Sequence, residues 1–466
     1  MGRLAPAALA AIVAVGLRVP FWHAPLTADE GGYAEIARLW GRGARLYQDV
    51  WVDRPQGLIA IFRATEAVGL GSATGLRIAA AAAAVVALGL LVLAASALCS
   101  RRVALLTGLL MATAGASPFI ESFTFSGELL ASVPALLSLL AFARYLRTRA
   151  RGWLALAGLL TGCALLVKQS GFDAGLAGVV FLVLSEGRRA LRPAALLVAA
   201  ALVPPALAFL AAADRGAWWF AVVGYRSRGD SVFTGSLTGR LGDLATSLPP
   251  AGVALGVPAL LAVVGWRQAP LLVRVWFGAA ALGVVGGGNF HAHYYIQLAG
   301  PLCVLGAIGF ERLRAAHSPS GLRAAAVAVV VVPLLAAPLW VAGPARQARL
   351  VFPHDPHLRT DAAVAAYVRA HTRPGKPIMV LWAAADVYYL ADRPPVGRYL
   401  WFRNVQTIPG ALAETQRALA GGKPNLVAVV QPLDSLDRSG RTARLLRARY
   451  RLVADVEGVP VFGRAR

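Results

Sequence analysis

Ile78–Leu98, with the sequence IAAAAAAVVALGLLVLAASAL, contains no charged residue and no proline. At about 1.5 Å of rise per residue, a helix of this length crosses the roughly 30 Å of hydrocarbon in a bilayer. Similar runs rich in alanine and leucine recur from the N-terminus to about Val341. The run therefore predicts a membrane-spanning helix, and its repetition predicts a polytopic α-helical membrane protein.

The composition of the whole chain favours the same class. Hydrophobic residues make up 58% of the 466 residues, charged residues make up 15%, and the mean hydropathy is +0.61. We expect about eleven transmembrane helices, at Leu4–Phe21, Ile78–Leu98, Val103–Ala116, Leu129–Ala143, Trp153–Val167, Phe172–Ser185, Ala194–Ala213, Ala251–Gly265, Leu271–Gly286, Tyr294–Phe310 and Ala324–Val341. The sixth run is short and carries Asp173, a pattern typical of a half-helix or a tilted one. The first run lacks a clear small-residue cleavage site, which favours an uncleaved helix over a signal peptide.

Charged residues separate between the two ends of the predicted helices. Short loops rich in arginine stay in the cytoplasm, so we place the N-terminus inside. The inner side then carries Arg3, Arg101, Arg102, Arg144, Arg147, Arg149, Arg151, Arg188, Arg189, Arg192, Arg267, Arg312, Arg314 and Arg323. The outer side carries Asp29, Glu30, Glu35, Asp49, Asp53, Glu66, Glu121, Glu128, Asp173, Asp214, Asp230 and Asp243. This arrangement explains much of the net charge of +23 without a nucleic-acid partner.

The chain after the last apolar run has a different pattern. Its short runs predict strands at Ile378–Trp382 and Leu426–Val430, helices at Asp361–Ala370 and Ala411–Ala420, and a hairpin at Arg451–Gly463. We expect residues 1–344 to form a transmembrane module and residues 345–466 to form a small C-terminal α/β domain. The predicted topology places that domain outside the cytoplasm.

Acids and aromatics gather in the first predicted outer loop, residues 22–77. Leu26-Thr27-Ala28-Asp29-Glu30-Gly31-Gly32-Tyr33 carries two adjacent acids, and Asp53-Arg54-Pro55-Gln56 follows in the same loop. Charge near a bilayer has to be solvated, paired or used in chemistry. We therefore predict a reaction centre at the membrane surface in this loop.

Other polar residues lie at the predicted outer ends of later helices. Glu121 and Glu128 belong to the second outer loop, and Glu128 opens the fourth apolar run. Glu128 is either a site residue or an ordinary acid stabilised by a helix dipole. Lys168 ends the fifth run, where it either reaches a phosphate or extends to the lipid headgroups.

Two further segments contain aromatic and basic residues. Tyr225, Arg226 and Arg228 lie in the long loop between Asp214 and Pro250, and suit a lipid phosphate or anionic lipid in general. His291-Ala292-His293-Tyr294 follows a glycine run after the ninth apolar segment. A His-X-His pattern can bind metal, but no second pair of ligands is close in sequence, so we predict no metal ligand. His293 and Tyr294 are either substrate-side residues or part of an interfacial aromatic belt.

The order and shared sidedness of these features resemble the GT-C membrane glycosyltransferases. The similarity is greatest to the protein O-mannosyltransferase and aminoarabinose transferase branch, glycosyltransferase family 39-like. Such enzymes take sugars carried on polyprenyl phosphate and transfer them on the non-cytoplasmic face. The resemblance implies a polyprenyl-phosphate sugar donor, transfer to a hydroxyl of a protein, lipid or glycan acceptor, and inversion at the anomeric centre.

The resemblance also implies roles for single residues in the first loop. Asp29 matches the acid of the family's first outer loop and would deprotonate the acceptor hydroxyl, with Glu30 assisting or orienting it. Arg54 stands where the family often has a lysine before two prolines, although Gln56 replaces the second proline. A guanidinium holds phosphate with two parallel hydrogen bonds. In the alternative reading, Asp29 caps a helix that begins near Gly31, and Arg54 forms a surface salt bridge with Asp53 or Asp49.

Later positions complete the predicted substrate site. Glu128 matches an acid, usually aspartate, at the start of the family's fourth span, and His293-Tyr294 match a histidine or arginine followed by tyrosine before a late span. The predicted substrate-binding residues are Tyr33, Asp53, Arg54, Glu121, Glu128, Lys168, Arg226, His293 and Tyr294.

Two rival classes use the same residues differently. A transporter or flippase of a lipid-linked sugar would bind the sugar without reacting, but the sequence shows neither repeated halves nor polar residues near mid-bilayer. A scaffold would need the membrane part only as an anchor, for which eleven spans are too many. We expect membrane lipids as neighbours and no cofactor, while a divalent metal remains open but not predicted.

Overall fold

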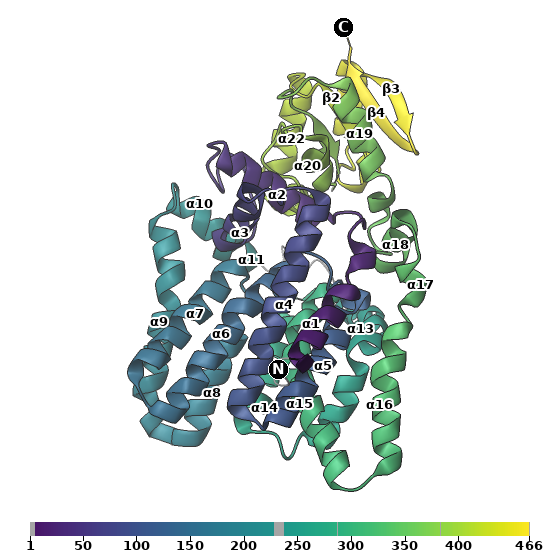
Figure 1. Cartoon of the computed structure of the whole chain (residues 1–466). Helices are drawn as coiled ribbons and strands as arrows, with labels where there is room; N and C mark the ends of the chain where they lie inside the picture. Colours follow the sequence, from purple (N-terminus) through teal and green to yellow (C-terminus); the bar gives the residue numbers. More distant parts are fainter. Residues whose placement is uncertain (1–4, 228–236, 287, 383, 466) are drawn as a thin grey trace.

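The computed structural model describes residues 5–227, 237–286, 288–382 and 384–465. Figure 1 shows a bundle of long helices, with a smaller segment that contains a sheet stacked on one end and the C-terminus at the tip of that segment. Two outer helices, α2 (Ala28–Gly41) and α3 (Gln56–Ala67), lie near the junction. These two helices therefore stand where the bundle meets the C-terminal segment.

Each of the eleven predicted apolar runs overlaps a helix of the bundle. These helices are α1 (Ala5–Gly16), α4 (Ala73–Leu98), α5 (Arg101–Thr113), α6 (Gly127–Thr148), α7 (Arg151–Val167), α8 (Asp173–Glu186), α9 (Leu191–Leu210), α13 (Leu237–Gly265), α14 (Leu271–Gly286), α15 (Ile296–Ala315) and α16 (Pro319–Leu334). In the described part of the chain, six helical stretches are long and apolar enough to cross a membrane, and three shorter apolar helices accompany them. The count of eleven crossings stays a prediction. Arg3, Leu4, Arg228 and Asp230, which the sequence analysis assigned to runs and loops, lie outside the described residues.

Short turns connect the bundle helices. They are η1 (Val19–Phe21), η2 (Ala114–Ala116), η3 (Pro118–Ile120), η4 (Gly187–Ala190), α10 (Arg215–Trp219), the π-helical η5 (Phe220–Gly224), α11 (Tyr225–Ser227) and η6 (Ala292–Tyr295). The 14 residues of α8 span about 21 Å, less than the hydrocarbon thickness, and η4 leads directly into α9. The sixth apolar run is therefore a short helix, as its length suggested.

The start of α13 differs from the sequence prediction. The helix begins at Leu237 rather than Ala251, so the predicted loop up to Pro250 was wrong. Pro249 and Pro250 lie inside the helix. Prolines break helices in water, but membrane helices tolerate them where neighbouring groups satisfy the freed backbone. The Pro249-Pro250 pair was therefore a poor marker of the helix end.

Glycines allow the bundle helices to pack closely. A Cβ atom on Gly309 of α15 would lie 1.9 Å from the carbonyl oxygen of Leu261 on α13. On α7, a Cβ atom on Gly158 would lie 2.3 Å from the carbonyl oxygen of Leu197 on α9. In a bilayer, helices gain little when apolar surface moves from lipid into a contact between helices. Close packing at small residues therefore stabilises their association.

The C-terminal segment contains the predicted mixture of strands and helices. Its elements are α17 (Ala337–Trp340), α18 (Pro344–Val351), η7 (Pro356–Arg359), α19 (Asp361–His371), β1 (Met379–Leu381), α20 (Asp386–Ala391), α21 (Phe402–Thr407), α22 (Ala411–Ala420), β2 (Leu426–Val429), η8 (Leu433–Ser435), α23 (Arg441–Arg449), β3 (Tyr450–Val456) and β4 (Val459–Arg464). The sheet order is β1-β2-β4-β3. β1 and β2 are parallel, while β4 runs antiparallel to both of its neighbours. Gly458 forms the turn between β3 and β4 with a φ of 86°, which suits glycine.

The C-terminal segment shares its hydrophobic core with the first outer loop. Tyr33 and Ile36 of α2 belong to the same buried cluster as Val364 of α19 and Val387 of α20. A Cβ atom on Gly31 would lie 2.4 Å from the Cα atom of Asp386, so α2 and α20 approach backbone to backbone. The boundary at residue 345 stays a prediction, but the core on its C-terminal side continues into the first loop.

Glu30 fixes the start of α2. Thr27 caps the helix: its hydroxyl accepts a hydrogen bond from the Glu30 backbone N–H at 3.1 Å, and the Glu30 carboxylate accepts one from the Thr27 N–H at 3.1 Å. The other Glu30 oxygen accepts hydrogen bonds from Arg77 of α4 and, at 2.7 Å, from the Phe125 N–H of the second outer loop. The reading in which Asp29 caps a helix near Gly31 was therefore wrong, because Thr27 already supplies the cap.

Replacing Arg77 with methionine should strongly destabilise the protein. The side chains of Arg77 and Glu30 are 1% and 2% exposed, so the substitution leaves a buried carboxylate without its cation. Breaking such a pair typically costs about 3–5 kcal/mol. The measurement is the unfolding temperature of the purified protein in detergent. Arg45→Met is the matched control, because the Arg45–Asp49 pair is exposed and should contribute little; equal shifts for the two variants would contradict the assigned role.

Candidate functional site

A polar cavity of about 360 Å³ lies between the bundle and the C-terminal segment. Its walls come from the start of α2, the two outer loops, the end of α7, the η6 turn and the C-terminal segment. All eleven residues predicted for the site line this cavity: Asp29, Glu30, Tyr33, Asp53, Arg54, Glu121, Glu128, Lys168, Arg226, His293 and Tyr294. The fold thus brings together side chains from five separated segments, while their individual roles stay predictions.

Asp29 is the open acid of the cavity. It is the second residue of α2, and its side chain is 43% exposed. The Tyr33 hydroxyl donates a hydrogen bond to Asp29 Oδ2 at 3.0 Å, and Arg54 Nη2 lies 4.0 Å from the same oxygen. Burial, with smaller effects of Asp29 and Asp53, raises the pKa of Tyr33 well above its usual value, so this hydroxyl remains a donor. Asp29 is therefore a partly solvated carboxylate held beside a cation.

One carboxylate holds two guanidinium groups in the cavity. Asp53 Oδ2 accepts a hydrogen bond from Arg54 Nη1 at 2.8 Å and another from Arg226 Nη2. Arg54 does pair with Asp53, as one alternative expected, but its side chain is only 12% exposed and lies inside the cavity rather than on the surface. Asp49 pairs with Arg45 instead. Asp53 therefore brings two guanidiniums together at the cavity, with Asp29 4.0 Å from Arg54, and guanidinium donors suit a phosphate.

A second set of charged groups also lines the cavity. Lys168 forms an ion pair with Glu128, and its ammonium lies 4.5 Å from the centre of the Tyr294 ring. His293 Nδ1 lies 2.7 Å from Glu121 Oε2, and His293 Nε2 lies 3.7 Å from Glu128 Oε1. Lys168 is 12% exposed, so the reading in which it extends to the headgroups was wrong. Glu128 lies in the first turn of α6, as the helix-dipole reading expected, and it also belongs to this set, while its role in a site stays a prediction.

The two histidines of the His-X-His segment have different surroundings. Their rings stack with centroids 5.6 Å apart. Burial, followed by the charge of His293, lowers the pKa of His291 to about 3, so His291 stays neutral. His293 instead contacts Glu121. Gly287, in the preceding glycine run, lies outside the described residues.

Glu30 lies where it can orient Asp29, one of the two roles expected of it, and its part in catalysis stays a prediction. It lines the cavity, yet its side chain is only 2% exposed and both oxygens accept hydrogen bonds within the protein. Its contacts position α2 and leave Asp29 as the acid that faces the cavity.

Sequence reasoning missed the part of the cavity that comes from the C-terminal segment. The missed residues with polar or aromatic side chains are Phe352, Asp355, His357, Trp401, Phe402, Arg403, Asn404 and Gln431. Trp401 packs against Tyr33 with ring centroids 5.6 Å apart. Trp401-Phe402-Arg403-Asn404 was a usable signal, because aromatic, basic and amide side chains follow one another after a turn.

A second cavity of about 230 Å³ adjoins the first on the bundle side. It shares Arg54, Glu128, Lys168, Arg226 and Tyr294 with the first cavity. Its other lining residues follow α7 or belong to α14 and α15. The cations therefore stand where a polar outer cavity meets an inner cavity among the bundle helices.

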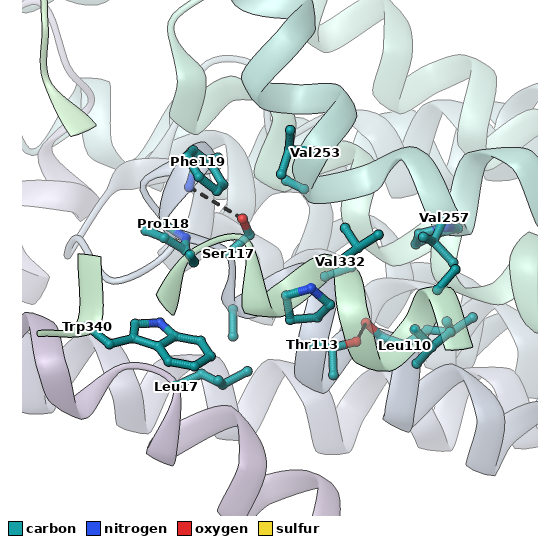
Figure 2. A pocket seen from close by; sticks show the side chains of 18 residues that line it. Leu17, Leu110, Thr113, Ser117, Pro118, Phe119, Val253, Val257, Val332 and Trp340 are labelled. Atoms are coloured by element: carbon teal, nitrogen blue, oxygen red, sulfur yellow. Dashed lines mark hydrogen bonds between the residues drawn. The ribbon is translucent and has the colours of Figure 1, made fainter. Parts of the chain in front are cut away.

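A separate apolar pocket lies deeper in the bundle. Figure 2 shows its lining, which includes Leu17, Val257, Val332 and Trp340 from four different parts of the chain. None of the described residues that line it is charged. It can hold apolar groups, but it offers no acid or cation for chemistry.

The comparisons with known proteins agree with this architecture. Residues 53–212 match the family described as dolichyl-phosphate-mannose-protein mannosyltransferase. The structure of ArnT from Cupriavidus metallidurans bound to undecaprenyl phosphate is similar at a TM-score of 0.67 with 17% identity, covering 99% of this chain and 98% of ArnT. The apo structure of the same ArnT is similar at a TM-score of 0.62 with 16% identity, covering 98% of this chain and 97% of ArnT.

A more distant oligosaccharyltransferase shares the fold. AglB from Archaeoglobus fulgidus, in complex with an inhibitory peptide and a dolichol-phosphate, gives a TM-score of 0.55 with 11% identity, covering 99% of this chain and 74% of AglB. No curated protein sequence matches this chain significantly. The predicted resemblance to GT-C membrane glycosyltransferases of the O-mannosyltransferase and ArnT type is confirmed.

Removing the shared carboxylate should make the protein sensitive to anions. In Asp53→Asn, the Arg54 and Arg226 guanidiniums lose their common counter-charge and repel each other, so the unfolding temperature should fall. Added inorganic phosphate should then restore part of the loss, because it replaces the missing negative charge. Melting curves at increasing phosphate concentration test this, with Asp49→Asn as the exposed control in the same loop. A fall in Asp53→Asn that phosphate leaves unchanged would argue against a cation pair that accepts an anion.

Proposed function

We propose that this GT-C-like membrane protein transfers a sugar from a polyprenyl-phosphate carrier to an acceptor hydroxyl on the outer face of the cytoplasmic membrane. One observation carries the proposal: an open carboxylate, Asp29, lies 4.0 Å from Arg54 of the Arg54–Asp53–Arg226 cluster, whose two guanidiniums line both cavities. An acid beside cations is what a displacement with a phosphate leaving group requires.

Each part of the substrates has its own place in the two cavities. The phosphate lies at their junction, near Arg54, Arg226 and Lys168, where guanidinium donors bind phosphate oxygens. The lipid enters through the inner cavity, and the sugar and the acceptor occupy the polar one, next to Tyr33, Glu128 and His293.

The chemical step is a single displacement. The acceptor oxygen attacks the anomeric carbon while its proton passes to Asp29, and the bond from that carbon to the phosphate oxygen breaks. The electron pair stays with the polyprenyl phosphate, whose growing negative charge Arg54, Arg226 and Lys168 stabilise. One displacement with one base inverts the anomeric centre. Glu30 positions α2 and takes no proton.

The outer location of the site rests on the distribution of charge. The loops on the side opposite the cavity are rich in arginine, including Arg147, Arg188 and Arg267, and such loops stay in the cytoplasm. The C-terminal segment, which closes the cavity, then lies outside. The acceptor is a protein, lipid or envelope polysaccharide that presents a hydroxyl.

Replacing Asp29 with asparagine should abolish transfer and preserve donor binding. A general base contributes about 100-fold to 10,000-fold, so transfer should fall by at least about 100-fold. Cells that lack the chain would receive wild type, Asp29→Asn or Asp49→Asn, and sugars in the protein, lipid and polysaccharide fractions would be quantified by mass spectrometry. Binding of undecaprenyl phosphate to the purified variants would be followed by native mass spectrometry.

The outcomes separate an enzyme from a carrier. We expect the Asp49→Asn control to behave as wild type, and Asp29→Asn to bind the lipid without transferring sugar. Full transfer by Asp29→Asn would remove this residue from the mechanism. Lipid-linked sugar that reaches the outer leaflet in a wild-type-dependent way, with no sugar on any acceptor, would identify a flippase instead.

A further inference from the structure

A second cluster of ionisable side chains lies beside the cavity, within the C-terminal segment. It consists of His357 at η7, Asp361 at the start of α19 and Asp386 at the start of α20. One ligand atom from each residue lies within 4.8 Å of the other two. The side chains of His357 and Asp361 are 7% and 2% exposed, and Asp386 is 1% exposed. None of the three was singled out from the sequence.

The two carboxylates of this cluster are not satisfied by the protein. His357 Nδ1 lies 2.5 Å from Asp361 Oδ2. Asp361 Oδ1 and both oxygens of Asp386 are buried without a hydrogen-bond partner in the described structure. Burial raises the pKa of Asp361 and of Asp386 well above the usual value, and the charge of Asp361 adds to the effect on Asp386. Buried carboxylates without partners are costly, so this cluster calls for a proton or a cation.

A proton meets the demand only in part. One proton shared between Asp361 and Asp386 engages two of the three unpartnered oxygens and leaves the third. A divalent cation bound by both oxygens of Asp386 and by Asp361 Oδ1 engages all three, and its charge balances the two acids. The imidazole of His357 completes a set of nitrogen and oxygen ligands, which is the kind that Zn²⁺ accepts.

We propose that His357, Asp361 and Asp386 form a binding site for a divalent transition-metal ion, with Zn²⁺ as the best match. In a tetrahedral site with bonds of about 2.1 Å, two ligand atoms of one ion lie about 3.4 Å apart, so atoms that lie within 4.8 Å of one another need to close by at most about 1.4 Å. Three protein ligands leave a fourth position for water, on the side where His357 and Asp355 line the cavity.

The position of the site indicates a structural task. The ion would join η7, α19 and α20, three elements that are separate in sequence. α20 packs directly on α2, where Gly31 leaves no space for a side chain against Asp386. Bound metal would therefore fix α20 to η7 and α19, and so stabilise the surface on which α2, the helix that carries Asp29, packs. This inference does not rest on the proposed sugar transfer, because the three ligands are distinct from the residues assigned to it.

Metal content and thermal stability test the site without any activity assay. The full chain, purified in detergent with a tag that lacks histidine, would be analysed by inductively coupled plasma mass spectrometry. We expect about one equivalent of zinc per chain. EDTA should lower the unfolding temperature by about 3 °C or more, and added Zn²⁺ should restore it, because an ion that binds only the folded state stabilises that state.

Variants identify the ligands. Asp386→Asn and His357→Gln should retain less than about a tenth of the zinc, and their unfolding temperatures should not respond to Zn²⁺ or EDTA. Asp434→Asn and His371→Gln, which change exposed residues of the same segment, should keep the wild-type zinc content and response.

The wild type alone can overturn the proposal, whether or not the variants fold. The proposal fails if the wild-type protein purifies without metal and its unfolding temperature does not respond to Zn²⁺, Mn²⁺ or EDTA. The shared proton would then be the remaining explanation for the two buried acids. In that case Asp386→Asn should raise the unfolding temperature, because it removes a buried acid.

Discussion

The Glu30 carboxylate is the contact on which the arrangement of the cavity depends. It joins the Thr27 cap of α2, the Arg77 side chain of α4 and the Phe125 backbone of the second outer loop. These three partners come from segments far apart in the chain, and all approach one nearly inaccessible acid. Asp29 directly precedes Glu30 in α2, so the same contact fixes where the Asp29 carboxylate points. Glu30 therefore holds the helix, while the adjacent Asp29 faces the cavity.

The electrostatics of the cavity follow from shared partners. Asp53 accepts hydrogen bonds from both Arg54 and Arg226, and Asp29 lies 4.0 Å from Arg54. Lys168 in turn pairs with Glu128, and His293 connects Glu128 to Glu121. Glu121 has a left-handed backbone conformation with a φ of 53°, which is uncommon for a residue with a side chain. Such strain typically persists where a site constrains the chain.

Much of the bundle was predictable because its signal is local. An apolar run such as Ile78–Leu98 specifies a helix by itself, and the β3–β4 hairpin follows from alternation around Gly458. Asp29 and Arg54 were identifiable from their place after the first run. By contrast, the pairing of Asp53 with Arg226, the burial of Lys168 and the contact between Tyr33 and Trp401 depend on tertiary packing. No spacing rule contains that information. The start of α13 was also mispredicted, because prolines do not mark the end of a membrane helix reliably.

The most direct test of the account is a cryo-EM structure of this protein with undecaprenyl phosphate. We predict phosphate density at the junction of the two cavities, within about 3 Å of donor atoms of Arg54 and Arg226, with Lys168 nearby and the Asp29 carboxylate facing the open polar cavity. The isoprenoid chain should continue through the inner cavity. Phosphate bound elsewhere, for example above the apolar pocket of Figure 2 and out of reach of Arg54, would contradict the account.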